Sequence, residues 1–263
     1  MAQNTIRLRD LNEPPGVQQP DHDTVLQRQQ VFGYTKEDLK LILGPMAQQG
    51  EEPVGSMGYD QPIAVLSNRP KLLFNYFKQN FAQVTNPAID STREDLVMSL
   101  TTFVGREGDL LDEKPRNAHV LHLPHPILTN YNLERLRHVS QGDFQAKTLP
   151  ILFRAAGGVE AMEQALQELN RGADEAVRQG YSLIILTDRG VDRDTAPIPS
   201  LLAVGSVHHH LIRRGTRNNV GLIVETGEAR EVHHFALLIG YGATAINPYL
   251  AFETLVDEQT GLK

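Results

Sequence analysis

Histidine, which binds metals and transfers protons near neutral pH, is concentrated in two short stretches of this sequence. Residues 208–210 are three consecutive histidines within AVGSVHHHLIRRG, and residues 233–234 are a pair within EVHHFALL. Both stretches have helical character, and consecutive residues on a helix point about 100° apart. The three rings therefore cannot bind one metal ion together, and Arg213 and Arg214 would repel a cation. We predict a structural cluster in which these histidines hydrogen-bond to backbone or carboxylate groups.

Charged side chains directly follow the apolar strands expected in the C-terminal half. Asp188 and Arg189 come after the run YSLIILT, and Glu225 ends the run NVGLIVE. Parallel α/β proteins bind their ligands at the carboxyl ends of the strands, so these three residues are a candidate catalytic or binding cluster. The alternative is that the carboxylates form ion pairs with Arg189 or Arg230 and hold the loops together. No nucleophile, metal set or phosphate loop accompanies them.

Composition narrows the class of protein. The formal net charge is −7 and the basic residues form no stripe, which excludes a nucleic-acid or anionic-membrane surface. There is no cysteine, which excludes disulfides, thiolate metal sites and a cysteine nucleophile within these residues. Residues 1–25 lack the apolar core of a signal peptide, and no apolar run reaches the roughly 18 residues that span a bilayer. We expect a soluble, cytoplasmic protein.

The elements expected before residue 150 are mainly helical. Residues 1–30 are polar and rich in proline, which predicts a linker or irregular tail. Thr35 and Asp38 have capping-box spacing at the start of a helix that Gly44-Pro45 should end. Further helices are expected at 70–84, with a broad aromatic face, at 91–100, begun by Ser91, and near 131–138, after a short strand and a proline-rich turn.

Residues 151–263 show a clearer alternation of helices and strands. A long helical run ends at Gly180 and is followed by the apolar strand of residues 181–187. Ser200 is expected to cap the helix that carries the three histidines, and Gly215 to end it before the next strand. Another helix and a short strand, TAINP, follow. Short links between alternating helices and strands predict an α/β fold of parallel βα units.

Several long stretches together resemble one family. They are EPVGSMGYDQPIAVLS, LFNYFKQNFAQVTNPAIDSTREDLVMSL, ILTDRGVD, PIPSLLAVGSVHHHLIRRG and VETGEAREVHHFALLIGYGATAINPYLAFET. They are similar to the central domain of the large glutamate synthase polypeptide, from about Val31 to the C-terminus. The resemblance implies an α/β architecture related to a (β/α) barrel, with a βα-repeat part over residues 151–263 and a mainly helical part before it.

The resemblance also implies a role within a larger enzyme. In this family an amidotransferase domain releases ammonia from glutamine, and the ammonia passes through a tunnel to an FMN domain. There it condenses with 2-oxoglutarate, and electrons supplied through a 3Fe-4S cluster by ferredoxin or an NAD(P)H-dependent subunit reduce the product to glutamate. The central domain joins the other two. This chain would hold no cofactor of its own, and as a fragment it would be inactive alone. The parent enzyme would be an oxidoreductase of the cytoplasm or of the plastid stroma.

One functional position is implied by the family motif. The turn VTNP, residues 84–87, would lie beside the ammonia path, with Thr85 and Asn86 as tunnel residues. A hydroxyl and an amide can hydrogen-bond neutral ammonia without trapping it as a buried charge would. The alternative is that Asn86-Pro87 simply ends the preceding aromatic helix.

Two other hypotheses remain open from the residues alone. One is a free-standing α/β enzyme that acts at the strand ends through Asp188, Arg189 and Glu225. The other is a domain that binds a small molecule. Bound FMN or independent catalysis would favour these alternatives over an interdomain module.

Overall fold

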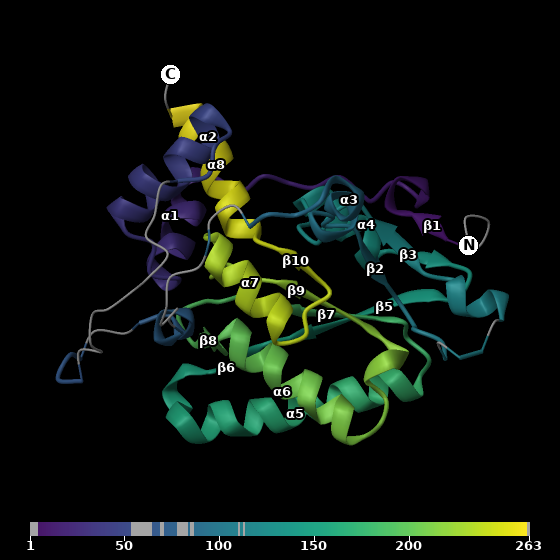
Figure 1. Ribbon diagram of the computed structural model, residues 1–263. Helices are drawn as coiled ribbons and strands as arrows, with labels where there is room; N and C mark the ends of the chain where they lie inside the picture. Colours follow the sequence, from purple (N-terminus) through teal and green to yellow (C-terminus); the bar gives the residue numbers. More distant parts are fainter. Residues whose placement is uncertain are drawn as a thin grey trace.

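The computed structural model describes residues 5–53, 65–68, 71–77, 84, 87–109, 111–112 and 114–261. A five-stranded sheet lies at its centre, with strand order β10-β9-β7-β5-β4 (Figure 1). Its strands are β4 (Ser140–Gln141), β5 (Phe144–Pro150), β7 (Leu183–Thr187), β9 (Gly221–Glu225) and β10 (Ala245–Asn247). The strands β5, β7, β9 and β10 are parallel, and β4 pairs antiparallel with β5. The expected α/β fold with parallel strands is confirmed.

The two central strands are apolar throughout because each face of the sheet has its own core. Every residue of β7 and β9 is buried. The side chains that face the first core are Ile184, Leu186, Leu222 and Val224, and those that face the second core are Leu183, Ile185 and Ile223. Strands covered on both faces need apolar residues at every position, not at alternate ones.

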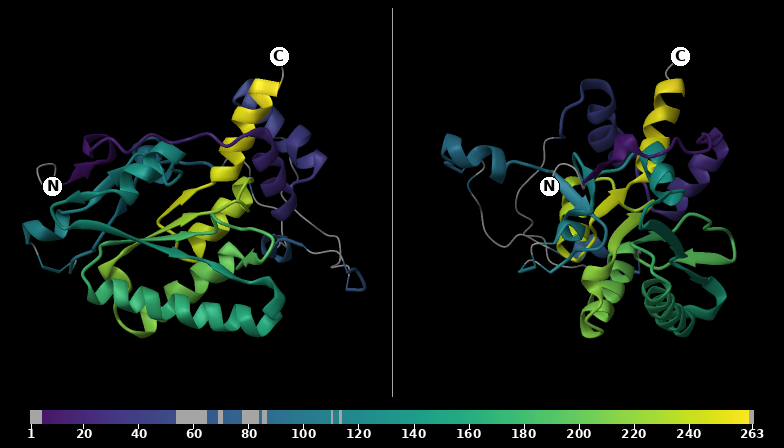
Figure 2. Two further views of the ribbon diagram at one scale, coloured as in Figure 1. Left: turned by 180° about the vertical axis from the view of Figure 1, so that it is seen from behind. Right: turned by 90° about the vertical axis from the view of Figure 1, so that its right-hand side faces the viewer.

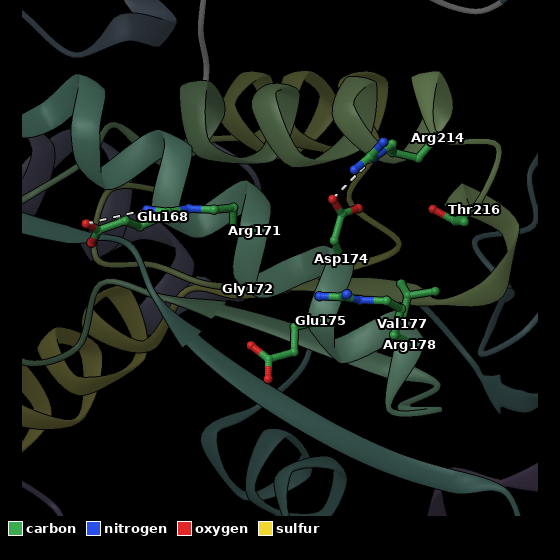
Figure 3. Close-up of a pocket in the computed structure, with 9 residues that line it drawn as sticks. All are labelled: Glu168, Arg171, Gly172, Asp174, Glu175, Val177, Arg178, Arg214 and Thr216. Carbon is green, nitrogen blue, oxygen red and sulfur yellow. Dashed lines mark hydrogen bonds and ion pairs between the residues drawn. The ribbon is translucent and has the colours of Figure 1, made fainter.

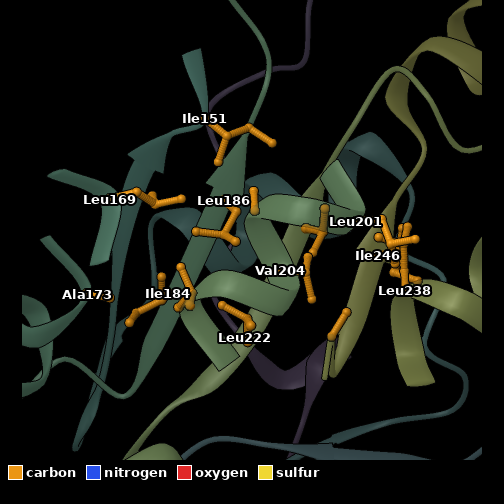
Figure 4. Packing of buried hydrophobic residues seen from close by; sticks show 14 of the residues in the cluster. Ile151, Leu169, Ala173, Ile184, Leu186, Leu201, Val204, Leu222, Leu238 and Ile246 are labelled. Carbon is orange, nitrogen blue, oxygen red and sulfur yellow. The ribbon is translucent and has the colours of Figure 1, made fainter. Parts of the chain in front are cut away.

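Three helices cover the first core: α5 (Gly158–Arg178), α6 (Ser200–Arg213) and α7 (Val232–Gly240) (Figure 2). Figure 4 shows Leu169 of α5, Leu201 and Val204 of α6 and Leu238 of α7 around this core. Gly180 has a φ of 87°, a left-handed conformation that lets the chain leave α5 and turn into β7.

The second core lies under a three-stranded sheet and α4 (Asn130–Arg137). That sheet has the order β1-β3-β2, with β1 (Ile6–Arg7), β2 (Thr102–Val104) and β3 (Leu121–Leu123). Leu133 and Leu136 of α4 are fully buried there, and Thr129 caps the helix by accepting a hydrogen bond from the Asn132 amide. The expected strand, turn and helix near residues 121–138 are confirmed.

Several other elements are short. They are α3 (Ser91–Val97), β6 (Leu152–Arg154), β8 (Thr195–Pro197) and the 3₁₀ helices Leu8–Asp10, Pro115–Ala118, Ala155–Gly157 and Arg217–Asn219. Residues 31–150 thus contain more strand than expected, since β2 to β5 all lie there. In the described part of the chain no helix is both long and apolar enough to cross a membrane.

The first thirty residues contain more structure than the expected irregular tail. Residues 22–31 form the helix α1 (His22–Val31), which packs against α8 (Tyr249–Gly261). The Gln29 side-chain amide donates to the Thr254 hydroxyl at 3.0 Å, and the ring of Phe32 lies edge-on to that of Tyr249. Within α1 only Val25 and Gln29 are buried, so the helix has no apolar periodicity by which the sequence could reveal it.

The helix that follows Thr35 does not end at Gly44-Pro45 as expected. The capping box is present, because the Thr35 amide donates to Asp38 Oδ2 and the Asp38 amide donates to Thr35 Oγ1. A π-helical stretch, Asp38–Leu43, then leads into α2 (Gly44–Gln49). Wider π turns accommodate the missing amide proton of Pro45, so the helix continues to Gln49. We call residues 36–49 the arm.

Three other local expectations need correction. Within residues 70–84, the described part forms only a 3₁₀ helix, Leu73–Tyr76, and Phe77 is already extended. Asp90, and not Ser91, caps α3 by accepting a hydrogen bond from the Arg93 amide. Ser200 is the first residue of α6 and its hydroxyl does not cap it; both its amide and its hydroxyl donate to Glu228 instead.

Candidate functional site

Glu225, at the end of β9, is the centre of a buried ion-pair network at the carboxyl ends of the strands. Its Oε1 accepts a hydrogen bond from Arg189 Nε at 2.6 Å. Its Oε2 accepts from Arg137 Nη2 at 2.7 Å and from Thr187 Oγ1 at 2.6 Å. Burial alone would raise the pKa of Glu225, but the two guanidinium groups and the hydroxyl hold this pKa below its usual range. Glu225 is therefore an ionised, fully engaged carboxylate.

A second carboxylate, Glu253 of α8, extends the network. Its side chain is 2% exposed and accepts from Arg189 Nη1 and from Arg28 Nη1, both at 2.8 Å. Charges therefore alternate along one chain of contacts: Arg137, Glu225, Arg189, Glu253 and Arg28. These contacts join α4, β9, the loop after β7, α8 and α1. The network connects the sheet to the two helices at the far ends of the described chain.

Tyr249 provides an aromatic surface for the centre of the network. The Arg189 guanidinium lies 4.0 Å from the centre of the Tyr249 ring, and that of Arg28 lies 5.9 Å away. Guanidinium groups are attracted to the face of an aromatic ring, and the effect is larger when water is excluded. Tyr249 is completely buried and begins α8. It thus orients Arg189 toward both carboxylates.

Asp188 is adjacent to Arg189 but lies outside this network. It is completely buried, and among the described residues no cation forms an ion pair with it. Its carboxyl accepts from Thr226 Oγ1 at 2.6 Å and from the Gly227 amide at 3.0 Å. Burial, and then the charge of Glu228, raise the pKa of Asp188 to about 8 in spite of these donors. At neutral pH Asp188 is therefore mostly protonated.

Glu228 and Arg230 complete the polar residues after β9. Glu228 Oε2 accepts from the Ser200 amide at 2.8 Å and from its hydroxyl at 2.5 Å, so it places a carboxylate at the N-terminus of α6. Burial raises the pKa of Glu228. Arg230 forms an ion pair with Asp38 of the arm at 3.0 Å and lies 4.2 Å from the centre of the Tyr34 ring. Arg230 therefore fastens the arm to the domain and does not pair with Asp188 or Glu225.

The strand-end cluster is built as a set of internal contacts. The structure brings Arg189 and Glu225 together, as an ion pair, and places Asp188 in a separate pocket of hydroxyl and amide donors. Asp188 and Glu225 are both at most 1% exposed, so water-borne substrates do not reach these carboxylates. The arrangement can orient loops and helices, and it presents no free nucleophile or base.

The histidines are dispersed, as the helical spacing predicts. His210 Nε2 lies 2.8 Å from a carboxylate oxygen of Asp174, and His208 Nδ1 accepts from Arg217 Nε at 3.0 Å. His234 is buried, stacks on Phe74 and accepts from the Arg230 amide at 3.3 Å. Burial, together with the charge of Arg230, lowers the pKa of His234 to about 3, so the ring is neutral. Among the described residues no group of three potential ligands could hold a metal ion.

Thr85 and Asn86, the residues expected beside an ammonia path, lie outside the described residues. Val84, which precedes them, is described, and its side chain is 74% exposed.

A polar cavity of about 740 Å³ lies between α5 and the end of α6 (Figure 3). Six charged side chains line it, three of each sign: Arg171, Arg178, Arg214, Glu168, Asp174 and Glu175. Figure 3 shows that Glu168 pairs with Arg171 and Asp174 with Arg214. With three charges of each sign, the lining has no net charge that would select an anion or a cation.

Several network residues have no signal in the sequence. Arg28, Arg137 and Glu253 lie on helices and not at strand ends, and they are far apart in the chain. Each looks like an ordinary charged residue on a solvated helix face. The only usable signal is the oppositely charged pair after β7 and β9, Arg189 and Glu225. When such charged groups are buried, they need further charged or hydrogen-bonding partners.

Taken together, the fold and site define an α/β domain whose strand ends are closed by its own side chains. Over residues 27–262 the chain matches the model of the glutamate synthase central domain. The chain belongs to this family.

Similar proteins are large glutamate synthase polypeptides. The chain is 48% identical to the glutamate synthase [NADPH] large chain of Bacillus subtilis, over 94% of this chain and 16% of that protein. It is 49% identical to the chloroplastic ferredoxin-dependent glutamate synthase of Spinacia oleracea, over 89% of this chain and 14% of that protein. The chain is 45% identical to the glutamate synthase [NADH] of Schizosaccharomyces pombe, over 85% of this chain and 11% of that protein. The chain thus spans less than a fifth of the length of these relatives.

Proposed function

We propose that this chain is the central interdomain module of a glutamate synthase, joining a glutamine amidotransferase domain to an FMN domain. The observation that carries the proposal is the family match over residues 27–262, in a chain that corresponds to 16% or less of relatives named as glutamate synthases. The parent enzyme would make glutamate from glutamine-derived ammonia and 2-oxoglutarate. Relatives named for ferredoxin, NADH and NADPH support an electron donor of one of these kinds.

The closed strand ends support a structural role in preference to an independent enzyme. In parallel α/β proteins a flavin phosphate or a substrate binds where strand ends are open. Here the carboxylates of Glu225 and Glu253 occupy that edge together with the arginines that pair with them, so the side chains that could hold a phosphate are already engaged with one another. The chain has no cysteine to ligate a 3Fe-4S cluster. FMN and the cluster therefore belong, in this proposal, to parts of the polypeptide outside this chain.

The first test uses the chain by itself. We expect the purified protein to form no glutamate from glutamine, 2-oxoglutarate and a reductant, and to show no flavin absorbance after incubation with FMN and desalting. The reason is that its strand-end side chains are engaged with one another. Stoichiometric FMN in the desalted protein, or glutamate formed at catalytic turnover, would overturn the proposal in favour of an independent enzyme.

The second test concerns the ammonia path. In the complete enzyme, Thr85→Ala and Asn86→Ala should loosen the coupling between glutamine hydrolysis and glutamate formation, because ammonia would lose a hydrogen-bonding partner along its path. We expect the ratio of glutamine consumed to glutamate made to rise above that of the unmodified enzyme. Thr92→Ala, at an exposed threonine of α3, is the matched control. Unchanged coupling in both Thr85 and Asn86 variants would refute the tunnel role.

A further inference from the structure

A groove of about 540 Å³ lies between the arm, α7 and α8, away from the strand-end network. The arm, α7 and α8 lie close together in Figure 1. Apolar side chains make up most of its lining: Leu41, Ile42, Leu43, Met46, Ile127, Val232, Phe235, Phe252 and Leu255. A volume of this size accommodates one or two large apolar side chains of a partner.

The groove exposes apolar surface to water from both of its walls. Leu41 on the arm is 64% exposed, and Val232, at the start of α7, is 59% exposed. These two side chains border a continuous apolar lining and are not isolated on a polar surface. Apolar surface gathered in a concave region is typical of a place where another polypeptide packs.

The charged residues that line the groove are mainly acidic. Glu37, Glu52 and Glu231 are among them, and in the described part of the chain none of these three pairs with a lysine or an arginine. His234 lies 3.9 Å from Glu231, but its ring is neutral. The single arginine of the lining, Arg230, is buried and already paired with Asp38. Lys36 and Lys40 belong to the arm but do not line the groove. The groove therefore combines an apolar floor with an unneutralised negative rim.

We propose that this groove is the docking site for an apolar segment flanked by Lys or Arg, contributed by another domain of the complete synthase polypeptide. The inference rests on the proposed function, which supplies the neighbouring domains. Bulky apolar anchors would fill the floor, and the basic flanks would meet Glu37, Glu52 and Glu231. More than four fifths of each relative lies outside the region that this chain matches, and that is where the segment would be found.

The absence of cysteine from the chain allows a direct test by alkylation. Val232→Cys places a thiol on the groove wall. Because this position is exposed, we expect the substitution to leave the structure of the domain unchanged. Its alkylation rate by iodoacetamide is measured by peptide mass spectrometry, in this chain alone and in the complete enzyme. We expect alkylation to be about tenfold slower in the complete enzyme. Ile212→Cys on α6, 49% exposed and outside the groove, gives the reference ratio.

The outcomes separate the inference from the proposed function. Equal ratios at the two positions would overturn the docking site, while coupled glutamate synthesis in the Val232→Cys enzyme would still support the module role. Slow alkylation in the chain alone would also overturn the docking site, because residues of this chain, or a second copy of it, would then cover the groove. The dependence of the alkylation rate on protein concentration distinguishes these two occupants.

Charge reversal tests the chemistry of the occupant. In the complete Val232→Cys enzyme, adding Glu37→Lys and Glu231→Lys should bring the alkylation rate to that of the chain alone with the same three substitutions, because the basic flanks would then be repelled. We expect at least a roughly fivefold rise. An alkylation rate unchanged by the two lysines would overturn the basic character that we assign to the segment.

Discussion

Two buried carboxyl groups at neighbouring strand ends have opposite protonation states because their neighbours differ. Glu225 contacts Arg189 and Arg137, and its pKa is below the usual range. Asp188 receives only hydroxyl and amide hydrogen bonds, and its pKa is raised to about 8. The Tyr249 hydroxyl is near enough to Asp188 to affect that pKa, yet it makes no hydrogen bond of normal geometry in the described part of the chain.

Asp188→Asn should therefore leave the protein at least as stable as the wild type at pH 7. A carboxyl whose pKa is higher in the folded state stabilises the fold below the unfolded pKa, near 4, and loses this contribution as pH rises toward 8. Asparagine cannot ionise, so the difference in the free energy of unfolding between variant and wild type should grow from pH 5 to pH 8. Urea denaturation at several pH values measures it.

Asp188→Ala is the control for lost hydrogen bonds. It removes the acceptor for Thr226 and Gly227 and, since alanine also cannot ionise, it should be about 1–3 kcal/mol less stable than Asp188→Asn at every pH. If Asp188→Asn were instead as destabilising as Asp188→Ala at pH 7, Asp188 would be an ionised carboxylate, contrary to the expectation above.

Glu225→Gln should lower the free energy of unfolding by about 2–4 kcal/mol at pH 7, since it leaves Arg189 and Arg137 without their central carboxylate. Both arginines are partly exposed to water, which limits this loss of stability. A carboxyl with a lowered folded pKa contributes stability above the unfolded pKa, near 4.5, and this is lost as pH falls through the folded pKa. The variant and the wild type should accordingly converge at acid pH. Glu231→Gln, at a half-exposed carboxylate, should change the midpoint of denaturation little.

Only part of this site could be predicted from the sequence. A charged residue after each of two apolar strands correctly indicates that Arg189 and Glu225 meet, because parallel strands end at one edge of a sheet. The sequence does not reveal that Asp188 points away from them, since this depends on the orientation of one loop. Nor does it reveal Glu253, whose pairing with Arg28 and Arg189 requires α8 to pack against α1 at the carboxyl ends of the strands.

At the scale of elements, β9 depends on a close approach that only glycine permits. A Cβ at Gly221 would overlap the Val104 side chain of β2 and lie 3.0 Å from the Gly105 amide nitrogen. Gly221→Ala should therefore lower the free energy of unfolding by about 1–3 kcal/mol. Gly16→Ala, with no neighbouring atom within 4 Å, is the matched control and should be nearly neutral in thermal denaturation. Equal midpoints for the two variants would contradict this close packing.

The predictability of an element depends on where its stability originates. The strands β7 and β9 and the helices α5 and α6 have strong apolar patterns, because they surround the first core, and the sequence locates them well. In contrast, α1 is held by polar contacts and by one buried apolar side chain, Val25, and α8 by buried charge as well as apolar packing. The π-helical arm is a further case: Gly44-Pro45 normally indicates a helix end, whereas the π turns and the tertiary contacts of the arm with Arg230 and α8 favour continuation.

At the scale of the whole molecule, α1 forms part of the folded domain through Arg28, Gln29 and Val25. A variant that begins at residue 32 should lose several degrees in its thermal midpoint, because the Glu253 carboxylate would lose Arg28 and the apolar residues beside α8 would be uncovered. It would also lose Leu8 and Leu11 from the second core. A variant that begins at residue 5 is the control. Indistinguishable midpoints would show that the stability of the domain does not depend on residues 5–31.

The pairing of Arg28 with Glu253 also constrains the order of events during synthesis. The two residues are 225 positions apart, so a ribosome must translate nearly all of this chain before the α1 and α8 helices can meet. By then β5, β7 and β9 can already have paired in succession. The nascent α1 therefore has no partner until α8 has been made, and pairing of the alternating charges between these two helices is a late step in the folding of this domain.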